Sequence, residues 1–287
     1  MHIWLTDVFV LSDEFSADLI QICFIDRRIK MILKKILKRT ALCIICAALG
    51  LAALTGCGQK EPGETMYKGS SNANTYDMIG KNKSGFTDMA NYTLPAEGEE
   101  IVAMTIKDKG TVKIKLFPDL LPKACANFVG LAAQGYYDGL SFHRVIADFM
   151  IQGGDPEGTG RGGTSVWGQA FDGGASEYLY HVKGALAYAN SGSTSTDGSQ
   201  FYIVVGQEFT PELFEKYKSQ NFSYTETAEN AYLEDGGTPW LDGSYTVFGQ
   251  VFEGIEIVED VCNNTAVDSS DKPVEDVIIE KIEIVKY

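Results

Sequence analysis

Apolar and polar residues alternate in two neighbouring runs of the chain, at 99–108 and 111–119. Alternation with a period of two is typical of strands that bury one face. Lys109 and Gly110 separate the runs, and a glycine in so short a connection favours a tight turn. The pattern therefore predicts a β-hairpin at the start of the folded part of the chain.

A helical spacing follows this hairpin. Within 121–135 the apolar residues recur at the spacing of one helix face, at Ala124, Phe128, Leu131 and Ala132. Gly135 is placed to end that helix. The run 255–262 is also helix-like, and 211–222 is compatible with a short helix that has Pro211 in its first turn.

Further apolar runs predict strands at 141–155, 181–190, 201–205 and 274–287, and a hairpin around Asp242-Gly243. The run 141–155 places Arg144 among apolar and aromatic residues. A buried guanidinium is costly unless a partner pairs with it. From this stretch alone, a solvated arginine on an edge strand is the favoured interpretation.

Composition narrows the class of protein. The chain has 287 residues, of which 45% are hydrophobic, enough for one large domain or two small ones. Its net charge of −15 argues against a nucleic-acid-binding surface. No Cys/His cluster has metal-ligand spacing, so we expect no metal and no cofactor.

The segment 158–163 matches G-x-G-x-x-G, but residues 164–168 do not begin a helix, so we interpret it as a surface loop.

The N-terminal part has the pattern of a targeting segment. Residues 31–56 carry a basic cluster, then 17 uncharged residues from Thr40 to Gly56, directly before Cys57. This is typical of a bacterial lipoprotein signal peptide, with Cys57 as the lipidated residue. The alternative is a transmembrane helix, at the short limit of length. Residues 1–30 carry several acidic residues and do not fit the pattern of a signal peptide. We interpret them as a mis-assigned extension before Met31, or else as a cytoplasmic segment.

The remaining chain divides into a polar linker and one domain. Residues 57–97 are rich in Gly, Ser, Asn and Lys and predict a flexible tether. The domain is expected at 98–287, with an acidic insertion at about 206–239. Cys125 and Cys262 could form a disulfide in an oxidising compartment, but two buried thiols are the favoured interpretation.

Five separated segments together resemble the cyclophilins, a family of peptidyl-prolyl cis–trans isomerases, over about residues 98–287. The segments, in chain order, are FHRV, DFMIQGGD, ALAYAN, DGSQFYI and WLDGSYTVFG. The resemblance implies a mainly β fold: a closed, eight-stranded antiparallel β-barrel with a helix covering each end. The hairpin-rich pattern is compatible with that fold, although spacing alone would not distinguish a barrel from a sandwich.

The resemblance also implies a set of site residues. The family's catalytic arginine corresponds to Arg144. The residues of its substrate site correspond to Phe149, Met150, Gln152, Ala189, Asn190, Gln200, Tyr202, Trp240, Leu241 and Tyr245. Two of them depart from the family: Tyr202 stands for a pocket phenylalanine and Tyr245 for a cleft histidine. The added hydroxyl of Tyr202 needs a hydrogen-bond partner.

The sequence thus predicts an enzyme that isomerises X–Pro bonds and assists the folding of exported proteins. We expect it on the extracytoplasmic face of the cell membrane, held by a lipid on Cys57 and acting as a monomer. Its partners would be proline-containing peptides and unfolded exported proteins, and Trp240 is compatible with cyclosporin binding. A non-catalytic module that binds proline peptides or another partner is the alternative, which Tyr202 and the insertion leave open.

Overall fold

The computed structural model describes residues 88–220 and 222–287. The predicted extension at 1–30, the signal peptide at 31–56 and Cys57 lie outside these residues, as does most of the linker at 57–97. Those assignments therefore stay predictions.

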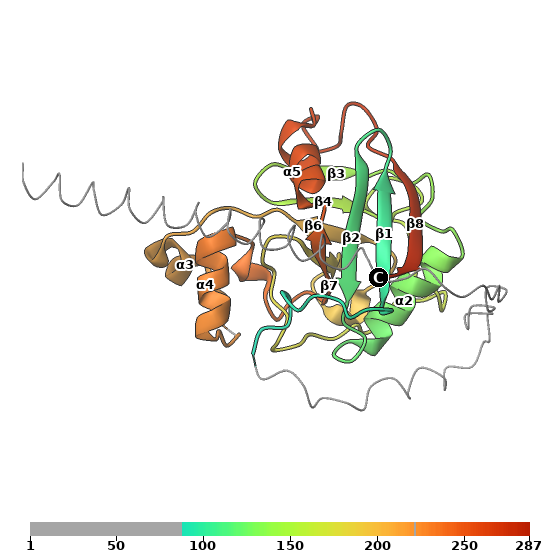
Figure 1. The fold of residues 1–287 in the computed structure, drawn as a ribbon. Helices are drawn as coiled ribbons and strands as arrows, with labels where there is room; N and C mark the ends of the chain where they lie inside the picture. Colours follow the sequence, from blue (N-terminus) through green and yellow to red (C-terminus); the bar gives the residue numbers. More distant parts are fainter. Residues whose placement is uncertain (1–87, 221) are drawn as a thin grey trace, which may run out of the picture. The chain divides into compact units, whose positions relative to one another are not determined.

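Eight antiparallel strands form one curled sheet, which confirms the mainly β architecture (Figure 1). In spatial order they run β3-β4-β6-β5-β7-β2-β1-β8. Their bounds are β1 (Glu100–Ile106), β2 (Gly110–Leu116), β3 (Arg144–Ile146), β4 (Met150–Gly153), β5 (Ala185–Tyr188), β6 (Phe201–Val204), β7 (Val247–Glu253) and β8 (Ile279–Lys286). The predicted hairpin at 99–119 is β1 with β2, which pair from Ile101–Lys115 to Ile106–Gly110.

The prediction of a closed barrel is wrong, because β3 and β8 are the two edges of the sheet and do not pair with each other. Instead, the segment before β3 meets the start of β8 and the residues just before it. Phe142 N–H donates to the carbonyl of Val277 at 2.9 Å, and Gly139 N–H to that of Ile279 at 2.8 Å. β3 is three residues long, and its Val145 N–H already bonds to the carbonyl of Asp271. It therefore has no ladder to share with β8.

Two helices pack on different strands of this sheet. α2 (Pro122–Ala133) contacts β7 and β8, whereas α5 (Ile255–Asn264) contacts β2, β3 and β4. Figure 1 shows α5 above the sheet and α2 at its lower side. Both helices were predicted, and Gly135 follows α2 with a φ of 67° that glycine adopts without strain. Because the sheet stays open, the helices cover groups of strands rather than two barrel ends.

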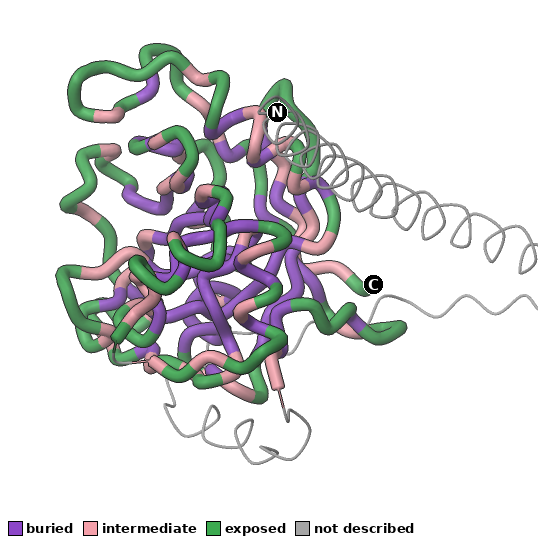
Figure 2. Tube along the Cα trace, turned by 90° about the vertical axis from the view of Figure 1, so that its left-hand side faces the viewer, coloured by how far each residue is buried: buried purple, intermediate pink, exposed green. Residues whose placement is uncertain are grey.

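The main core lies between the sheet and the helices α2 and α5. Figure 2 shows buried segments gathered in the interior of the domain. Phe128 of α2 is fully buried and packs against Tyr137, Phe201 and Phe248. Cys125 and Cys262 are buried and are not joined by a disulfide, as the favoured interpretation held. Burial raises the pKa of the Cys125 thiol to about 12, so this cysteine is chemically inert at neutral pH.

The insertion at 206–239 is folded around a buried cluster of its own. It holds α3 (Pro211–Tyr217), which begins at the predicted proline, and α4 (Glu226–Asp235), which the sequence analysis did not predict. We call the buried residues the insertion cluster: Tyr180, Val182, Phe209, Phe214, Ala228, Ala231 and Tyr232. Since Tyr180 and Val182 precede β5, this cluster joins the insertion to the sheet.

The chain enters the domain along residues 88–92, which we call the strap. The Asp88 carboxylate accepts hydrogen bonds from the hydroxyls of Thr225, at 2.6 Å, and Thr227 at the start of α4. Ala90 N–H donates to the carbonyl of Tyr178, and Asn91 is buried. Contacts with the domain therefore begin before the predicted boundary at residue 98.

Two local predictions differ from the structure. The run 141–155 is two short strands rather than one, because Asp148 has a φ of 55° and turns the chain between β3 and β4. Aspartate tolerates this left-handed conformation better than most residues. The hairpin at Asp242-Gly243 is absent, since a 3₁₀ turn, η3 (Pro239–Leu241), precedes it in place of a strand.

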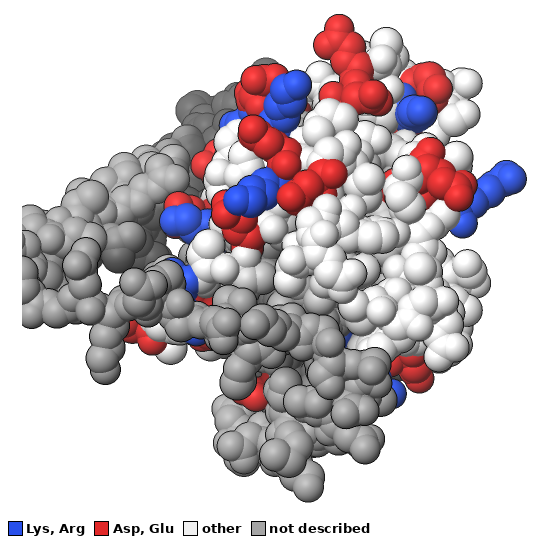
Figure 3. Space-filling model, turned by 90° about the vertical axis from the view of Figure 1, so that its right-hand side faces the viewer, with Lys and Arg blue, Asp and Glu red and all other residues white. Residues whose placement is uncertain are grey.

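The surface of the described residues mixes both signs of charge. On the face shown in Figure 3, basic side chains lie beside acidic ones and form no continuous basic area. Exposed ion pairs such as Lys281–Glu283 and Lys286–Glu100 are of this mixed kind. Within 88–220 and 222–287 we find no helix whose length and apolar character would let it cross a membrane.

Candidate active site

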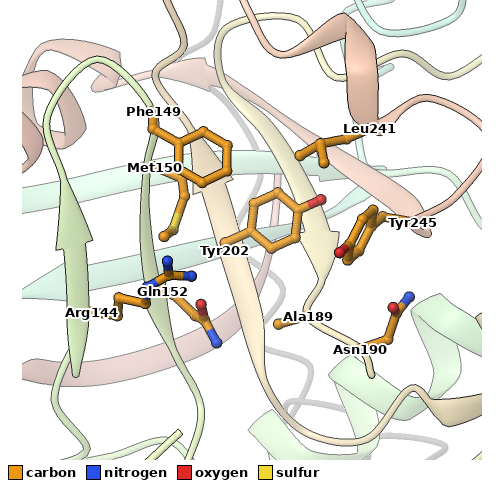
Figure 4. A pocket seen from close by; sticks show the side chains of 9 residues that line it. All are labelled: Arg144, Phe149, Met150, Gln152, Ala189, Asn190, Tyr202, Leu241 and Tyr245. Carbon is orange, nitrogen blue, oxygen red and sulfur yellow. The ribbon is translucent and has the colours of Figure 1, made fainter. Parts of the chain in front are cut away.

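A cavity of about 170 Å³ opens beside β3, β4 and β6. It is lined by Arg144, Phe149, Met150, Gln152, Ala189, Asn190, Tyr202, Leu241 and Tyr245. Figure 4 shows these side chains around a common space, with Arg144 and Gln152 on one side and Tyr245 and Asn190 on the other. The structure thus brings nine of the eleven predicted cleft residues together and leaves out Gln200 and Trp240.

The strand register explains why these residues meet. Arg144 lies opposite Gln152 in the β3–β4 pair, and Gln152 lies opposite Tyr202 in the β4–β6 pair. Directly opposed residues in antiparallel strands point to the same face of a sheet, as do residues two apart, so Met150 joins the row. Three strands therefore present one line of side chains to the cavity.

Arg144 is only loosely tied to the protein. Its side chain is 44% exposed, and its Nε lies 3.6 Å from Oδ2 of Asp271, which is 43% exposed. An exposed pair at this distance contributes little to stability. Figure 4 shows the guanidinium end directed toward Met150 and Gln152 rather than away from the cavity. The donors of Arg144 are therefore available to a bound molecule.

Gln200 supports the site from behind. Gln152 Nε2 donates to Gln200 Oε1 at 2.9 Å, and Gln200 Nε2 donates to the carbonyl of Gly162 at 2.8 Å. Gln200 is thus a link between Gln152, which lines the cavity, and the glycine-rich loop at 158–163. Such a link restricts the orientation of the Gln152 amide.

The glycine-rich loop is itself fixed by the buried Asp155. This carboxylate accepts backbone N–H bonds from Glu157 at 2.9 Å, Gly160 at 2.7 Å and Gly162 at 3.2 Å. Burial alone would raise the pKa of Asp155, but the backbone donors, that of Glu157 first, together lower it. The surface-loop interpretation holds, and the loop contacts Gln200 through the carbonyl of Gly162.

Two tyrosines form the far wall of the cavity. The rings of Tyr202 and Tyr245 meet edge to face with centroids 6.1 Å apart, and Tyr202 stacks on the buried His181. The Tyr202 hydroxyl, predicted to need a partner, has no hydrogen bond within the described residues, nor does Nε2 of His181. Burial first, and then the nearby Tyr245, raises the pKa of Tyr202 well above its usual value.

A buried carboxylate anchors Leu241 at the rim. The next residue, Asp242, accepts a hydrogen bond from the His181 backbone N–H at 2.8 Å and contacts His181 Nδ1 at 2.8 Å. Its second oxygen accepts the hydroxyl of Tyr232, in α4, at 2.6 Å. The insertion therefore helps to fix the position of an apolar residue of the cavity.

Trp240 lies beside the cavity and not in it. Its ring packs against Phe149, Phe209 and Tyr217, with centroids 6.1, 6.4 and 5.9 Å away. Phe209 and Tyr217 belong to the insertion, so the insertion draws Trp240 into an aromatic group next to the cavity wall. The interpretation of Trp240 as compatible with cyclosporin binding stays a prediction.

Asn190 is held by residues that the sequence analysis did not single out. Its Nδ2 donates to Oδ1 of Asp197 at 3.2 Å, and Oδ2 of Asp197 accepts the Thr246 hydroxyl at 2.6 Å. Asp197 and Thr246 lie in the segments DGSQFYI and WLDGSYTVFG, which carry the resemblance, but neither was predicted as a site residue, because their contact joins positions 49 residues apart.

The described residues, 88–220 and 222–287, contain no group of three or more His, Cys, Asp or Glu side chains that could hold a metal ion. What the cavity offers is an apolar wall, amide groups and one guanidinium. This set can bind an apolar ring beside a peptide group and direct a cationic donor at that group.

The sequence model of the family described as "Cyclophilin type peptidyl-prolyl cis-trans isomerase/CLD" matches residues 101–284. A protein of Staphylococcus haemolyticus named "Putative peptidyl-prolyl cis-trans isomerase" is 46% identical over 201 residues, 68% of this chain and 98% of that protein. A Staphylococcus aureus protein of the same name is also 46% identical, over 68% of this chain and 99% of its own length.

Solved structures show the same similarity. A cyclophilin type peptidyl-prolyl cis-trans isomerase of Cryptosporidium parvum, crystallised in the presence of the dipeptide Ala-Pro, is 34% identical with a TM-score of 0.50. The match covers 65% of this chain and 99% of that one. A second crystal structure of that protein gives 34% identity and a TM-score of 0.51, over 66% and 98% of the two chains.

Proposed function

The chain belongs to the cyclophilin-type peptidyl-prolyl cis–trans isomerase family and is an enzyme of that class, and we propose that it isomerises X–Pro bonds in the cavity beside Arg144. The single observation that carries the proposal is the placement of Arg144 in a cavity that also presents an apolar wall, formed by Phe149, Met150 and Leu241. The dipeptide present with the Cryptosporidium parvum relative is a proline peptide, which supports the same class of ligand.

The reaction needs no covalent bond to break. Rotation about a peptide bond meets a barrier of about 18–20 kcal/mol, which the partial double bond between C and N creates. An enzyme lowers this barrier if it binds the twisted amide more tightly than either planar isomer. In the twisted amide the nitrogen regains a lone pair, and a cationic donor beside it stabilises that lone pair.

The cavity divides this work among its residues. Phe149, Met150 and Leu241 offer apolar surface to the proline ring, while Gln152 and Asn190 are placed to hold the peptide backbone. Arg144 then donates to the imide nitrogen. A bound peptide displaces water from the guanidinium. The hydrogen bond from Arg144 to the imide nitrogen is therefore stronger in the transition state, where the lone pair develops on that nitrogen. A lysine would substitute poorly, since it lacks the rigid fork of donors of arginine.

Replacing Arg144 tests this mechanism. We expect Arg144→Ala to lower kcat/KM for a proline tetrapeptide on the order of 100-fold, because one preorganised donor to the transition state is lost. Two-dimensional NMR exchange measures the turnover, and thermal unfolding shows that the variant remains folded. Arg144→Lys should recover only part of the activity.

Asp271→Asn is the matched control for the Arg144 variants, because asparagine tolerates the φ of 62° at this position. It removes the charge that faces Arg144 without removing the guanidinium, and the pair is exposed and 3.6 Å apart. We expect less than about a twofold change in kcat/KM. Wild-type turnover in Arg144→Ala would refute the mechanism. If the protein is instead a module that only binds proline peptides, the wild type would bind the tetrapeptide without any turnover.

We also propose that the enzyme acts outside the cytoplasm, anchored by a lipid on Cys57, and assists the folding of exported proteins. The support is the pattern of residues 31–57: a basic cluster, 17 uncharged residues and a cysteine after a small residue. Lipoprotein processing supplies more than one acyl chain, which stable anchoring requires. Exported chains that contain proline would meet the enzyme where they fold.

A further inference from the structure

Asp197 is a buried carboxylate next to the cavity but not in its lining. It follows the 3₁₀ turn η2 (Thr194–Thr196) and has no exposed surface. One oxygen accepts the Asn190 amide at 3.2 Å and the other accepts the Thr246 hydroxyl at 2.6 Å. No lysine, arginine or histidine forms an ion pair with it in the described part of the chain. Asn190 is therefore held by an unneutralised buried charge.

The Asn190 side chain is fixed at both ends of its amide. While Nδ2 donates to Asp197, Oδ1 accepts the backbone N–H of Gly192 at 3.0 Å. A flip of the amide would lose both bonds. The backbone N–H and C=O of Asn190 form no backbone hydrogen bond within residues 88–220 and 222–287, so both can serve a bound peptide. The side-chain bonds thus hold in place a backbone segment that faces the cavity.

We propose that Asp197 is a positioning residue for substrate. As a carboxylate it keeps Asn190 in its peptide-binding geometry, and when it is protonated its hold on Asn190 weakens. The affinity for peptide therefore falls in mild acid. The proposal rests on the proposed function, since it takes the peptide to bind along Asn190. It adds a pH-dependent control of substrate binding to that function.

Hydrogen-bond chemistry explains the loosening. If the proton goes to the oxygen that faces Asn190, two donors oppose each other and the bond is lost. If it goes to the other oxygen, the Thr246 hydroxyl can rotate and accept it, and Asn190 keeps a neutral acceptor. A charge-assisted hydrogen bond is about twice as strong as a neutral one, so the hold on Asn190 weakens in both cases.

The surroundings of Asp197 place this change in an accessible pH range. Burial, and secondarily the charge of Asp172, raises the pKa of Asp197 to about 6, although bonds from Thr246, Asn190 and the Gly173 backbone oppose the shift. The other titratable groups that face it are Tyr188 of β5 and Tyr202 of β6. Asp197 is therefore mainly a carboxylate at pH 7.5 and mainly a neutral acid at pH 5.

The test is to measure kcat and KM of the full-length chain between pH 5 and pH 8. The substrate is an acetylated, amidated peptide Ala-Ala-Pro-Phe, which has no titrating group in this range. We expect KM of the wild type to rise about fivefold from pH 7.5 to pH 5, with little change in kcat. A fivefold change corresponds to roughly the net free energy of one hydrogen bond.

Two variants separate positioning from a merely structural role. Asp197→Asn resembles the protonated acid, so its KM should be raised at pH 7.5 and constant across the range. Thr246→Val keeps the carboxylate but removes a donor that lowers its pKa, so the midpoint of the KM transition should move to higher pH.

A KM that is constant from pH 5 to pH 8 in the wild type would overturn the proposal, and so would a wild-type pH profile in Asp197→Asn. Either result with normal turnover leaves the proposed function intact. Absence of turnover at every pH would instead refute the proposed function.

Discussion

Two buried tyrosines show how differently one hydroxyl can affect stability. Tyr188 donates to the Ala124 carbonyl at 3.0 Å and accepts the Asn127 amide at 2.8 Å. Tyr202, which replaces the phenylalanine expected from the family, has no such partner within the described residues. A buried polar group without a hydrogen bond costs about 1–3 kcal/mol.

We therefore expect Tyr202→Phe to raise the free energy of unfolding by about 1 kcal/mol, because it removes an unsatisfied hydroxyl and keeps the ring. Urea unfolding followed by fluorescence measures the change. Tyr188→Phe is the matched control and should lower the free energy of unfolding by about 1–2 kcal/mol, since its hydroxyl is bonded twice. Equal destabilisation of both variants would contradict the assignment.

Sequence resemblance located most cavity residues but not what holds them. Arg144, Gln152 and Tyr202 were predicted one by one, and the strand register brings them into one row. Asp197 was not predicted, because its burial depends on residues distant in the chain. Trp240 was placed in the cleft, but aromatic residues of the insertion hold it beside the cavity.

At the scale of elements, the insertion behaves as a small packing unit attached to the sheet. Phe214 of α3 is buried and packs against Tyr224 and Tyr232, with centroids 5.3 Å apart in each case. Phe128, also buried, belongs to the main core instead. Loss of either ring should therefore affect a different set of elements.

We expect Phe214→Ala to cost about 3–5 kcal/mol of local packing and to speed amide hydrogen exchange in α3 and α4, while the strands of the sheet keep their protection. Hydrogen exchange read by mass spectrometry resolves the two regions. Phe128→Ala is the control that should lower protection throughout the sheet. Loss of protection in the sheet of Phe214→Ala would show that the insertion is not a separate unit.

Periodicity predicted the long elements and missed the short ones. The hairpin β1–β2 and the helix α2 have strong patterns and match their predictions. The split of 141–155 depends on the left-handed backbone of Asp148, which a pattern of apolar residues does not encode. α4 was missed because its polar sequence has a weak apolar face and is stabilised by the insertion cluster.

At the scale of the whole molecule, local patterns in the sequence could not predict the order of the strands in the sheet. β5 lies between β6 and β7, and the two edges, β3 and β8, come from distant parts of the chain. The resemblance correctly predicted eight antiparallel strands. It also predicted a closed barrel, which does not form because the short β3 does not pair with β8. Bonds between 139–142 and 277–279 join the edges without a ladder.

The proposed lipid anchor gives a prediction for the complete chain. Cys57→Ala should move the protein from the membrane fraction to the soluble fraction of cells, because the acylated residue is lost. Cell fractionation with immunoblotting measures the distribution, and Cys125→Ala is the matched control that should leave it unchanged. Membrane association that survives Cys57→Ala would refute the anchor but not the enzymatic activity.

The strap has a mechanical consequence. Force that reaches residue 88 from the N-terminal side would load the bonds between Asp88 and the threonines of α4 before it reaches any strand of the sheet. Those bonds are exposed and can yield one at a time, whereas the bonds of the buried Asn91 come next along the chain. The outermost bonds of the strap can thus open while the buried bonds of Asn91 still hold the chain to the domain.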